Sequence, residues 1–134
     1  VSGASWLDRE WSTSALGPGQ EGWDWFALQL SDSTELMYYQ LRGPGGAPDS
    51  LSAGAFFNHR GAKTPLAVSD VRLRVLGQAR MPSGARYPAE WALEVPRLAL
   101  SLRIRPQVAA QELPVSLRYW EGTVSISGSR AGQP

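Results

Sequence analysis

The sequence predicts an all-β, antiparallel domain of roughly eight or nine strands, in a barrel or a sandwich. Two observations carry this prediction. Glycine and proline are frequent, with 14 and 10 residues, and they recur between short apolar runs. The longer segments alternate between apolar and polar residues, whereas helical periodicity is hard to find. A chain of 134 residues is the size of one domain with its own core.

The strands follow from this alternation. The clearest pair is residues 23–30 and 35–42, because the Ser31-Asp32-Ser33 cluster between them is typical of a tight hairpin turn. Residues 98–105 alternate leucine or isoleucine with serine and arginine, which predicts one buried face. The remaining predicted strands are residues 5–11, 51–59, 71–79, 90–95 and 117–127. A short helical turn is expected around Gln107–Glu112.

Composition excludes several classes of function. A net charge of +1 leaves no basic stripe of the kind that binds nucleic acid. There is no cysteine, and His59 is the single histidine, so neither a cysteine-ligated nor a multi-histidine metal site can form from this chain. No apolar run is long enough to predict a membrane-spanning segment. No glycine loop has the pattern that cradles phosphates, so no cofactor is predicted.

The aromatic residues allow two interpretations. The six tryptophans either fill the interior or line an apolar cavity for a hydrophobic ligand. Trp23 and Trp25 share one face of their predicted strand, and Asp24 between them faces the other way. Alternation also places Trp91, Leu93 and Val95 on one face of their strand.

Three carboxylates lie on aromatic-rich strands, namely Asp8, Asp24 and Glu121. In an apolar cavity, a carboxyl group has a raised pKa and can act as a general acid. The alternative is a structural ion pair with a nearby arginine such as Arg42 or Arg118. For His59, beside Arg60, the structural alternative is a loop or strand-end residue.

Several segments together resemble the AttH / carotenoid 1,2-hydratase (hydroxyneurosporene synthase) family. Residues 2–12 (SGASWLDREWS) are similar to its G-x-x-W-x-D-R-E-W signature, and residues 87–96 (YPAEWALEVP) to its Y-P-x-x-W-x-L-x-V-P motif. The segments GWDWFALQL, ELMYYQLR, QE and YWEG, at residues 22–30, 35–42, 111–112 and 119–122, resemble further motifs of the family in the same order.

The resemblance implies a lipocalin-like (calycin-type) β-barrel over residues 1–134, as the second half of a two-barrel bacterial protein. The start at Val1 and the lack of the family's further strand of the G-Y-x-E-L-x-G-Y type after the predicted strand 117–127 fit that expectation. The expected partners are a hydrophobic, isoprenoid or lipid-like ligand and the N-terminal barrel of the same protein. The expected location is periplasmic or secreted, with a cytoplasmic location left open.

The resemblance also implies candidate site residues. The family's hydratases add water to an isoprenoid double bond after a carboxylic acid protonates it, and Asp8 occupies the position expected for that acid. Trp6 and Glu10 are its expected neighbours. The expected ligand-binding residues are Trp23, Trp25, Tyr38, Trp91, Tyr119 and Glu121. Three roles therefore remain open: ligand binding without chemistry; a hydro-lyase whose site is shared with the first barrel, so that the isolated chain is inactive; or a purely structural barrel that supports the missing half.

Overall fold

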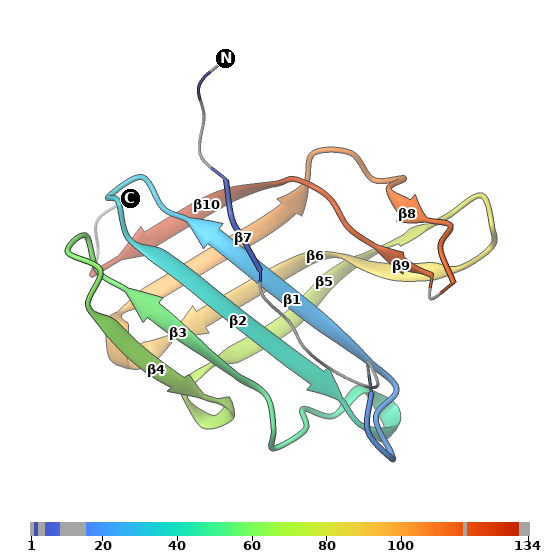
Figure 1. The fold of residues 1–134 in the computed structure, drawn as a ribbon, viewed down its shortest axis with the longest axis horizontal. Helices are drawn as coiled ribbons and strands as arrows, with labels where there is room; N and C mark the ends of the chain where they lie inside the picture. The colour runs from blue at the N-terminus through green and yellow to red at the C-terminus, as the bar shows by residue number, and fades with distance from the viewer. Residues whose placement is uncertain (1, 3–4, 9–15, 117, 132–134) are drawn as a thin grey trace. The chain divides into compact units, whose positions relative to one another are not determined.

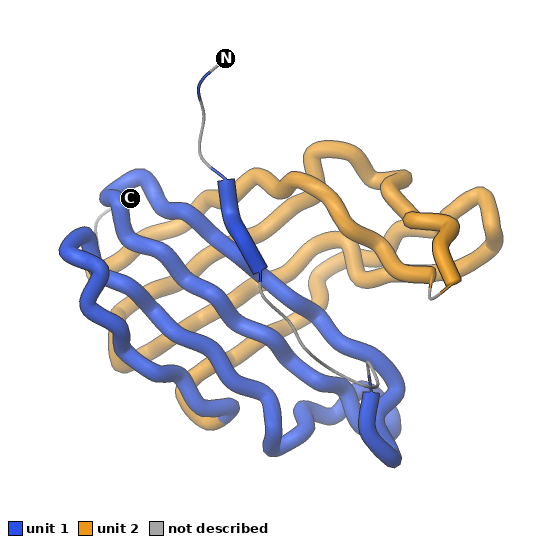
Figure 2. The backbone as a smooth tube through the Cα atoms, in the orientation of Figure 1, with its two compact units in different colours: residues 1–68 blue, residues 69–134 orange. Residues whose placement is uncertain are grey.

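The computed structural model describes residues 2, 5–8, 16–116 and 118–131. It divides into two compact units, residues 1–68 and 69–134, which are described separately (Figure 2). In the described ranges every element is a β-strand or a short 3₁₀ turn, and no helix is long and apolar enough to cross a membrane.

The first unit contains a four-stranded antiparallel sheet in the order β1-β2-β3-β4 (Figure 1). The β1–β2 hairpin turns where the sequence predicts it, with the backbone N–H and the hydroxyl of Thr34 both donating hydrogen bonds to Asp32. Ser33 adopts the left-handed conformation at this turn, with φ 61°. The strands are β1 (Gly22–Gln29), β2 (Glu35–Arg42), β3 (Ala53–Phe57) and β4 (Lys63–Ala67).

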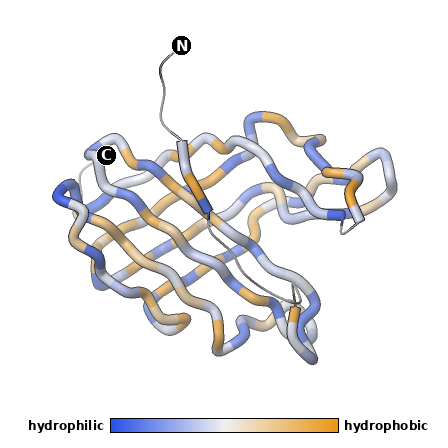
Figure 3. The backbone as a smooth tube through the Cα atoms, in the orientation of Figure 1, coloured by the Kyte–Doolittle hydropathy of each residue, from blue (hydrophilic) through white to orange (hydrophobic). Residues whose placement is uncertain are grey.

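One face of the first sheet is buried and apolar. Phe26 lies opposite Tyr38, and Leu28 lies opposite Leu36. These side chains are at most 5% exposed, and Phe56 and Leu66 extend the same face onto β3 and β4. Figure 3 shows the apolar residues of these strands alternating with more polar ones along the backbone. This alternation is the reason that the strands could be recognised in the sequence.

The second unit contains a four-stranded antiparallel sheet in the order β10-β7-β6-β5 and a small two-stranded sheet, β8-β9. On its buried face the cross-strand pairs are Trp91 with Ile104, Leu93 with Leu102 and Val95 with Leu100. The strands are β5 (Arg72–Arg80), β6 (Arg86–Val95), β7 (Leu100–Pro106), β8 (Glu112–Leu113), β9 (Tyr119–Trp120) and β10 (Val124–Arg130).

The antiparallel all-β class is therefore confirmed, with several corrections in detail. In the described residues the strands form separate sheets and are not closed into one barrel. Strand β4 was not predicted because its five residues include Pro65, which lacks a ladder donor and is tolerated at an edge position. The helical turn expected around Gln107–Glu112 is wrong, since this segment bends and then enters β8.

Two further segments differ from the prediction. The single strand expected over residues 117–127 is interrupted after Trp120 and resumes as β10 at Val124. A side chain at Gly122, within the interruption, would overlap the side chain of Gln111. The strand expected over residues 5–11 is only partly described: residues 5–8 are outside any strand, and residues 9–11 lie outside the described ranges.

Candidate functional site

The buried face of the first sheet carries polar groups at one end. Asp24 on β1 lies opposite Gln40 on β2, and both residues are buried, with exposed fractions of 7% and 8%. Ser52, just before β3, is 2% exposed and its hydroxyl accepts a hydrogen bond of 3.0 Å from the backbone N–H of Leu41. Burial of polar groups on an otherwise apolar surface costs free energy unless partners are supplied, so each of them requires an explanation.

Asp24 is partnered by Arg42. The guanidinium Nη1 lies 3.4 Å from the Asp24 carboxylate oxygen Oδ2. Gly22 makes this possible, because it lies directly opposite Arg42 and a Cβ there would overlap the guanidinium. The sequence had left open an ion pair with Arg42 as the structural role of a nearby carboxylate, and the structure confirms that role for Asp24.

Tyr38 lies at the centre of the buried face. The residue is 0% exposed, and among the described residues its hydroxyl has no hydrogen-bond partner. Burial raises the pKa of Tyr38, with a smaller contribution from Tyr39. Gly54, on the next strand, lies opposite Tyr38, and a Cβ at Gly54 would overlap both the Tyr38 ring and the backbone. The Tyr38 ring therefore fits against β3 only because Gly54 has no side chain.

The buried face combines an apolar surface with one polar group at its centre. Phe26, Leu28, Leu36 and Phe56 supply the apolar surface, and the Tyr38 hydroxyl can donate or accept one hydrogen bond. Binding sites for small hydrophobic molecules typically combine such a surface with a few convergent polar groups. Among the described residues, no cluster of three or more histidine, aspartate or glutamate side chains could hold a metal ion.

The predicted acid, Asp8, is exposed in the described segment 5–8. Its carboxylate accepts a hydrogen bond of 2.8 Å from the indole N–H of Trp6, so the structure does bring these two predicted residues together. Glu10, the third member of the predicted group, lies outside the described residues. The proposed acid role of Asp8 stays a prediction.

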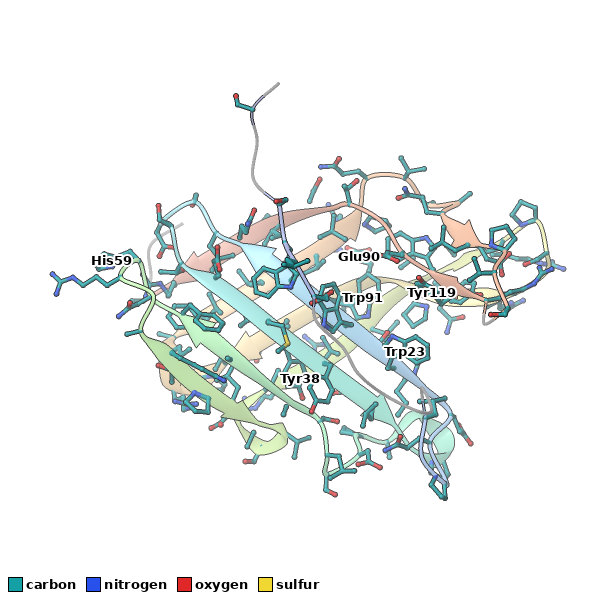
Figure 4. All side chains as sticks on the ribbon, in the orientation of Figure 1. Trp23, Tyr38, His59, Glu90, Trp91 and Tyr119 are labelled. Atoms are coloured by element: carbon teal, nitrogen blue, oxygen red, sulfur yellow. The ribbon has the colours of Figure 1, made fainter. Side chains whose placement is uncertain are left out.

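The predicted ligand-binding residues of the first unit are divided between two faces of the sheet. Tyr38 is on the buried face, whereas Trp23 and Trp25 are on the opposite face, where Trp25 is 39% exposed and lies across from Tyr39. Because adjacent residues of a strand point to opposite faces, Tyr38 and the two tryptophans do not contribute to one common surface. Figure 4 shows Trp23 and Tyr38 on neighbouring strands.

The predicted residues of the second unit also separate. Trp91 is 5% exposed on β6. Tyr119 on β9 is half-buried and forms a hydrogen bond with the side chain of Glu121; this bond and the charge of Glu121 raise the pKa of Tyr119. Tyr119 and Glu121 therefore lie together, at the exposed β8–β9 end of the unit.

His59 lies in the exposed turn between β3 and β4, apart from Trp23 and Tyr38 (Figure 4). Asn58 holds this turn, since its side-chain oxygen accepts hydrogen bonds from the backbone N–H groups of Arg60 and Ala62. The expectation that His59 is a loop residue is confirmed.

Sequence reasoning missed Gln40 and Ser52. Gln40 was recoverable, because alternation along β2 places it on the same face as Leu36 and Tyr38. Ser52 had no such signal, since it lies in the turn before β3 and its burial depends on the path of the chain around Asp49.

Comparison with known proteins gives a family and a fold. The sequence matches the AttH-like protein family over residues 1–134. A crystal structure assigned to AttH, from Nitrosomonas europaea, superimposes with a TM-score of 0.78 at 28% identity. The structure of kievitone hydratase from Nectria haematococca superimposes with a TM-score of 0.72 at 17% identity, a level that shows likeness of fold alone. Each match covers 92% of this chain and 38% of the other. Among curated protein sequences none matches this chain.

Proposed function

Because the chain belongs to the AttH-like family, we propose that it is a lipocalin-like domain that binds a hydrophobic, isoprenoid or lipid-like molecule on the buried face of the first sheet. The observation that carries the proposal is the Tyr38 hydroxyl, which is buried among apolar side chains and has no partner in the described residues. A buried hydroxyl without a partner costs stability, so its retention is explained if a ligand supplies the missing hydrogen bond.

The rest of the buried face fits the same ligand. The apolar side chains of Phe26, Leu28 and Leu36 would contact its hydrocarbon part, and Asp24 is already neutralised by Arg42. A ligand with a neutral polar group, such as an alcohol or a carbonyl, therefore matches this face better than one with a second negative charge.

The proposal is tested by titration with farnesol, an uncharged isoprenoid alcohol, followed by intrinsic tryptophan fluorescence. We expect saturable binding that Tyr38→Phe weakens about threefold to tenfold, which is the effect of losing one neutral hydrogen bond. Tyr39→Phe is the matched control, because it removes the same atom from the adjacent residue on the opposite face. Equal affinity of the two variants, or no saturable response, would refute the proposal.

A second candidate function is a hydro-lyase. The observation that favours it is the contact between Asp8 and Trp6, which brings a carboxyl group and an aromatic ring together at the position that the family motif gives to the acid. Asp24 is not a candidate for the acid, because its carboxylate is already paired with Arg42.

The complete protein is the proper sample for this test, and we propose that an N-terminal barrel is part of it, since the chain spans 38% of the two matched structures. The Asp8→Asn variant would be assayed for hydration of isoprenoid alkenes, with Asp24→Asn as the control that removes a carboxylate paired with Arg42. Loss of turnover in the folded Asp8 variant would support its role as the acid, and unchanged turnover in that variant would reject it.

A further inference from the structure

The exposed face of the second sheet has an unusual distribution of charge. On this face Arg74, Ala92 and Arg103 form one row across β5, β6 and β7; the row of Arg72, Glu94 and Ser101 flanks it on one side, and Glu90, which pairs with Gly77 of β5, lies on the other. Both flanking glutamates of β6 contact an arginine: Glu94 lies 4.0 Å from Arg72, and Glu90 contacts Arg105 at 2.7 Å. In the middle row Ala92 lies between Arg74 and Arg103. The middle row therefore has two arginines and no carboxylate of its own.

The neighbouring carboxylates do not balance this row. Glu90 accepts hydrogen bonds from the Nε atoms of both Arg103 and Arg105, so one negative charge is shared by two guanidinium groups. Arg103 is half exposed despite this contact. Arg74 is exposed and, within the described part of the chain, makes no ion pair. Around the middle row there are thus four arginines, at positions 72, 74, 103 and 105, and two glutamates, at positions 90 and 94.

A shallow groove of about 330 Å³ lies over Ala92. Arg74 and Arg103 border it, the hydroxyl-bearing residues Ser101 and Ser127 line it as well, and Leu76 forms an apolar part of its wall. Leu76 is 40% exposed at the β-bulge of β5 and so presents apolar surface to solvent. This volume is at the lower end of the range found for small-molecule sites.

We propose that this groove binds a small organic carboxylate. The carboxylate lies over Ala92, where it accepts hydrogen bonds from Arg74 and Arg103, and the apolar part of the ligand lies against Leu76. The two strands that carry these arginines are separated by β6, about 10 Å apart, and the long side chains converge on a group placed between them. Glu94, which also lines the groove, is engaged by Arg72 and excludes a ligand with a larger negative charge.

The test uses sodium hexanoate and sodium acetate as probes on the chain of residues 1–134, with the side-chain N–H signals of arginine followed by NMR at constant ionic strength. We expect hexanoate to shift the Arg74 and Arg103 signals saturably, with a Kd on the order of a few millimolar as befits exposed ion pairs. Acetate, which lacks the apolar tail, should bind at least threefold more weakly.

Three variants make the assignment specific. Arg74→Gln should weaken hexanoate binding about fivefold or more, and Ala92→Glu should abolish it by placing a carboxylate of the protein itself over the groove. Arg80→Gln is the matched control, since Arg80 is an exposed residue of the same strand that does not line the groove. No saturable shift, equal affinity for acetate and hexanoate, or equal loss in the Arg74 and Arg80 variants would overturn the proposal.

This site is independent of the proposed farnesol site. Tyr38→Phe, in the other unit, should leave hexanoate binding unchanged, so failure of one proposal is distinguishable from failure of the other.

Discussion

At the scale of single residues, two buried polar side chains of the first sheet behave differently. Asp24 has its charge matched by Arg42 at 3.4 Å, so it can remain on a buried face at modest cost. Tyr38 is more deeply buried, and its hydroxyl has no partner among the described residues. The fold itself explains the first side chain, whereas the ligand that we propose would supply the partner of the second.

Tyr38→Phe should therefore not destabilise the protein without ligand. The change keeps the ring and removes a buried hydroxyl that is unpaired in the described part of the chain, so we expect the free energy of unfolding to stay the same or rise by about 1 kcal/mol. Because burial raises the pKa of Tyr38, the wild-type protein should lose stability as the pH rises above about 10, where the unfolded chain ionises first, and the variant should lose less. Urea denaturation at pH 7 and pH 10.5 measures both effects. A loss of 1 kcal/mol or more at pH 7 would show that the hydroxyl has a structural role.

Glu90 should contribute stability that depends on acid pH. Hydrogen bonds from Arg103 and then Arg105 hold the pKa of Glu90 below its ordinary value of 4.5. The contribution is therefore present above about pH 4.5, and it is lost as the pH falls through the lowered value of the folded state. Glu90→Gln should lower the unfolding midpoint in urea at pH 7, and its difference from wild type should shrink toward pH 3. A difference that is constant with pH would contradict the assigned ion pairs.

At the scale of elements, register fixes which side chains share a face. The β1–β2 register pairs Phe26 with Tyr38 on the buried face and Trp25 with Tyr39 on the opposite face. The β2–β3 register then places Gly54 against Tyr38. A glycine at this position is needed because the adjacent ring and backbone occupy the space of a side chain.

Gly54→Ala should be strongly destabilising. Its Cβ would overlap the carbonyl oxygen of Met37 and the Cα of Tyr38, which are backbone atoms that cannot rotate away. We expect a loss of about 2 kcal/mol or more in the free energy of unfolding, measured by urea denaturation. Gly17→Ala is the control, because a Cβ there meets the Gln20 side chain at an ordinary distance of 3.5 Å. Similar stability of the two variants would show that β3 is placed differently.

The sequence was most informative where local signals agreed. The hairpin of residues 22–42 was predictable because alternation and turn residues indicate the same register, and β2 begins and ends where expected. The Pro-containing edge strand β4 and the interruption before β10 were not predictable, since both depend on contacts with distant residues. The same limit applied to the candidate site: the alternation placed Asp24 correctly, but nothing local revealed that the Tyr38 hydroxyl has no partner within the described ranges.

At the scale of the whole molecule, the two sheets carry different chemistry. The first has an apolar face with a buried hydroxyl, and the second has an exposed face rich in arginine. The net charge of +1 does not reveal this difference between the sheets, because acidic and basic residues nearly cancel over the whole chain. Family membership and the two similar structures define the fold, whereas the function proposed for each face depends on its own residues.

Intermolecular NMR contacts with bound farnesol test whether a hydrophobic ligand binds the buried face of the first sheet. We expect contacts from farnesol to the methyl groups of Leu28, Leu36 and Leu66, which share that face. Contacts confined to the methyl groups of Ala27 and Met37, which lie on the opposite face beside Trp25 and Tyr39, would contradict it.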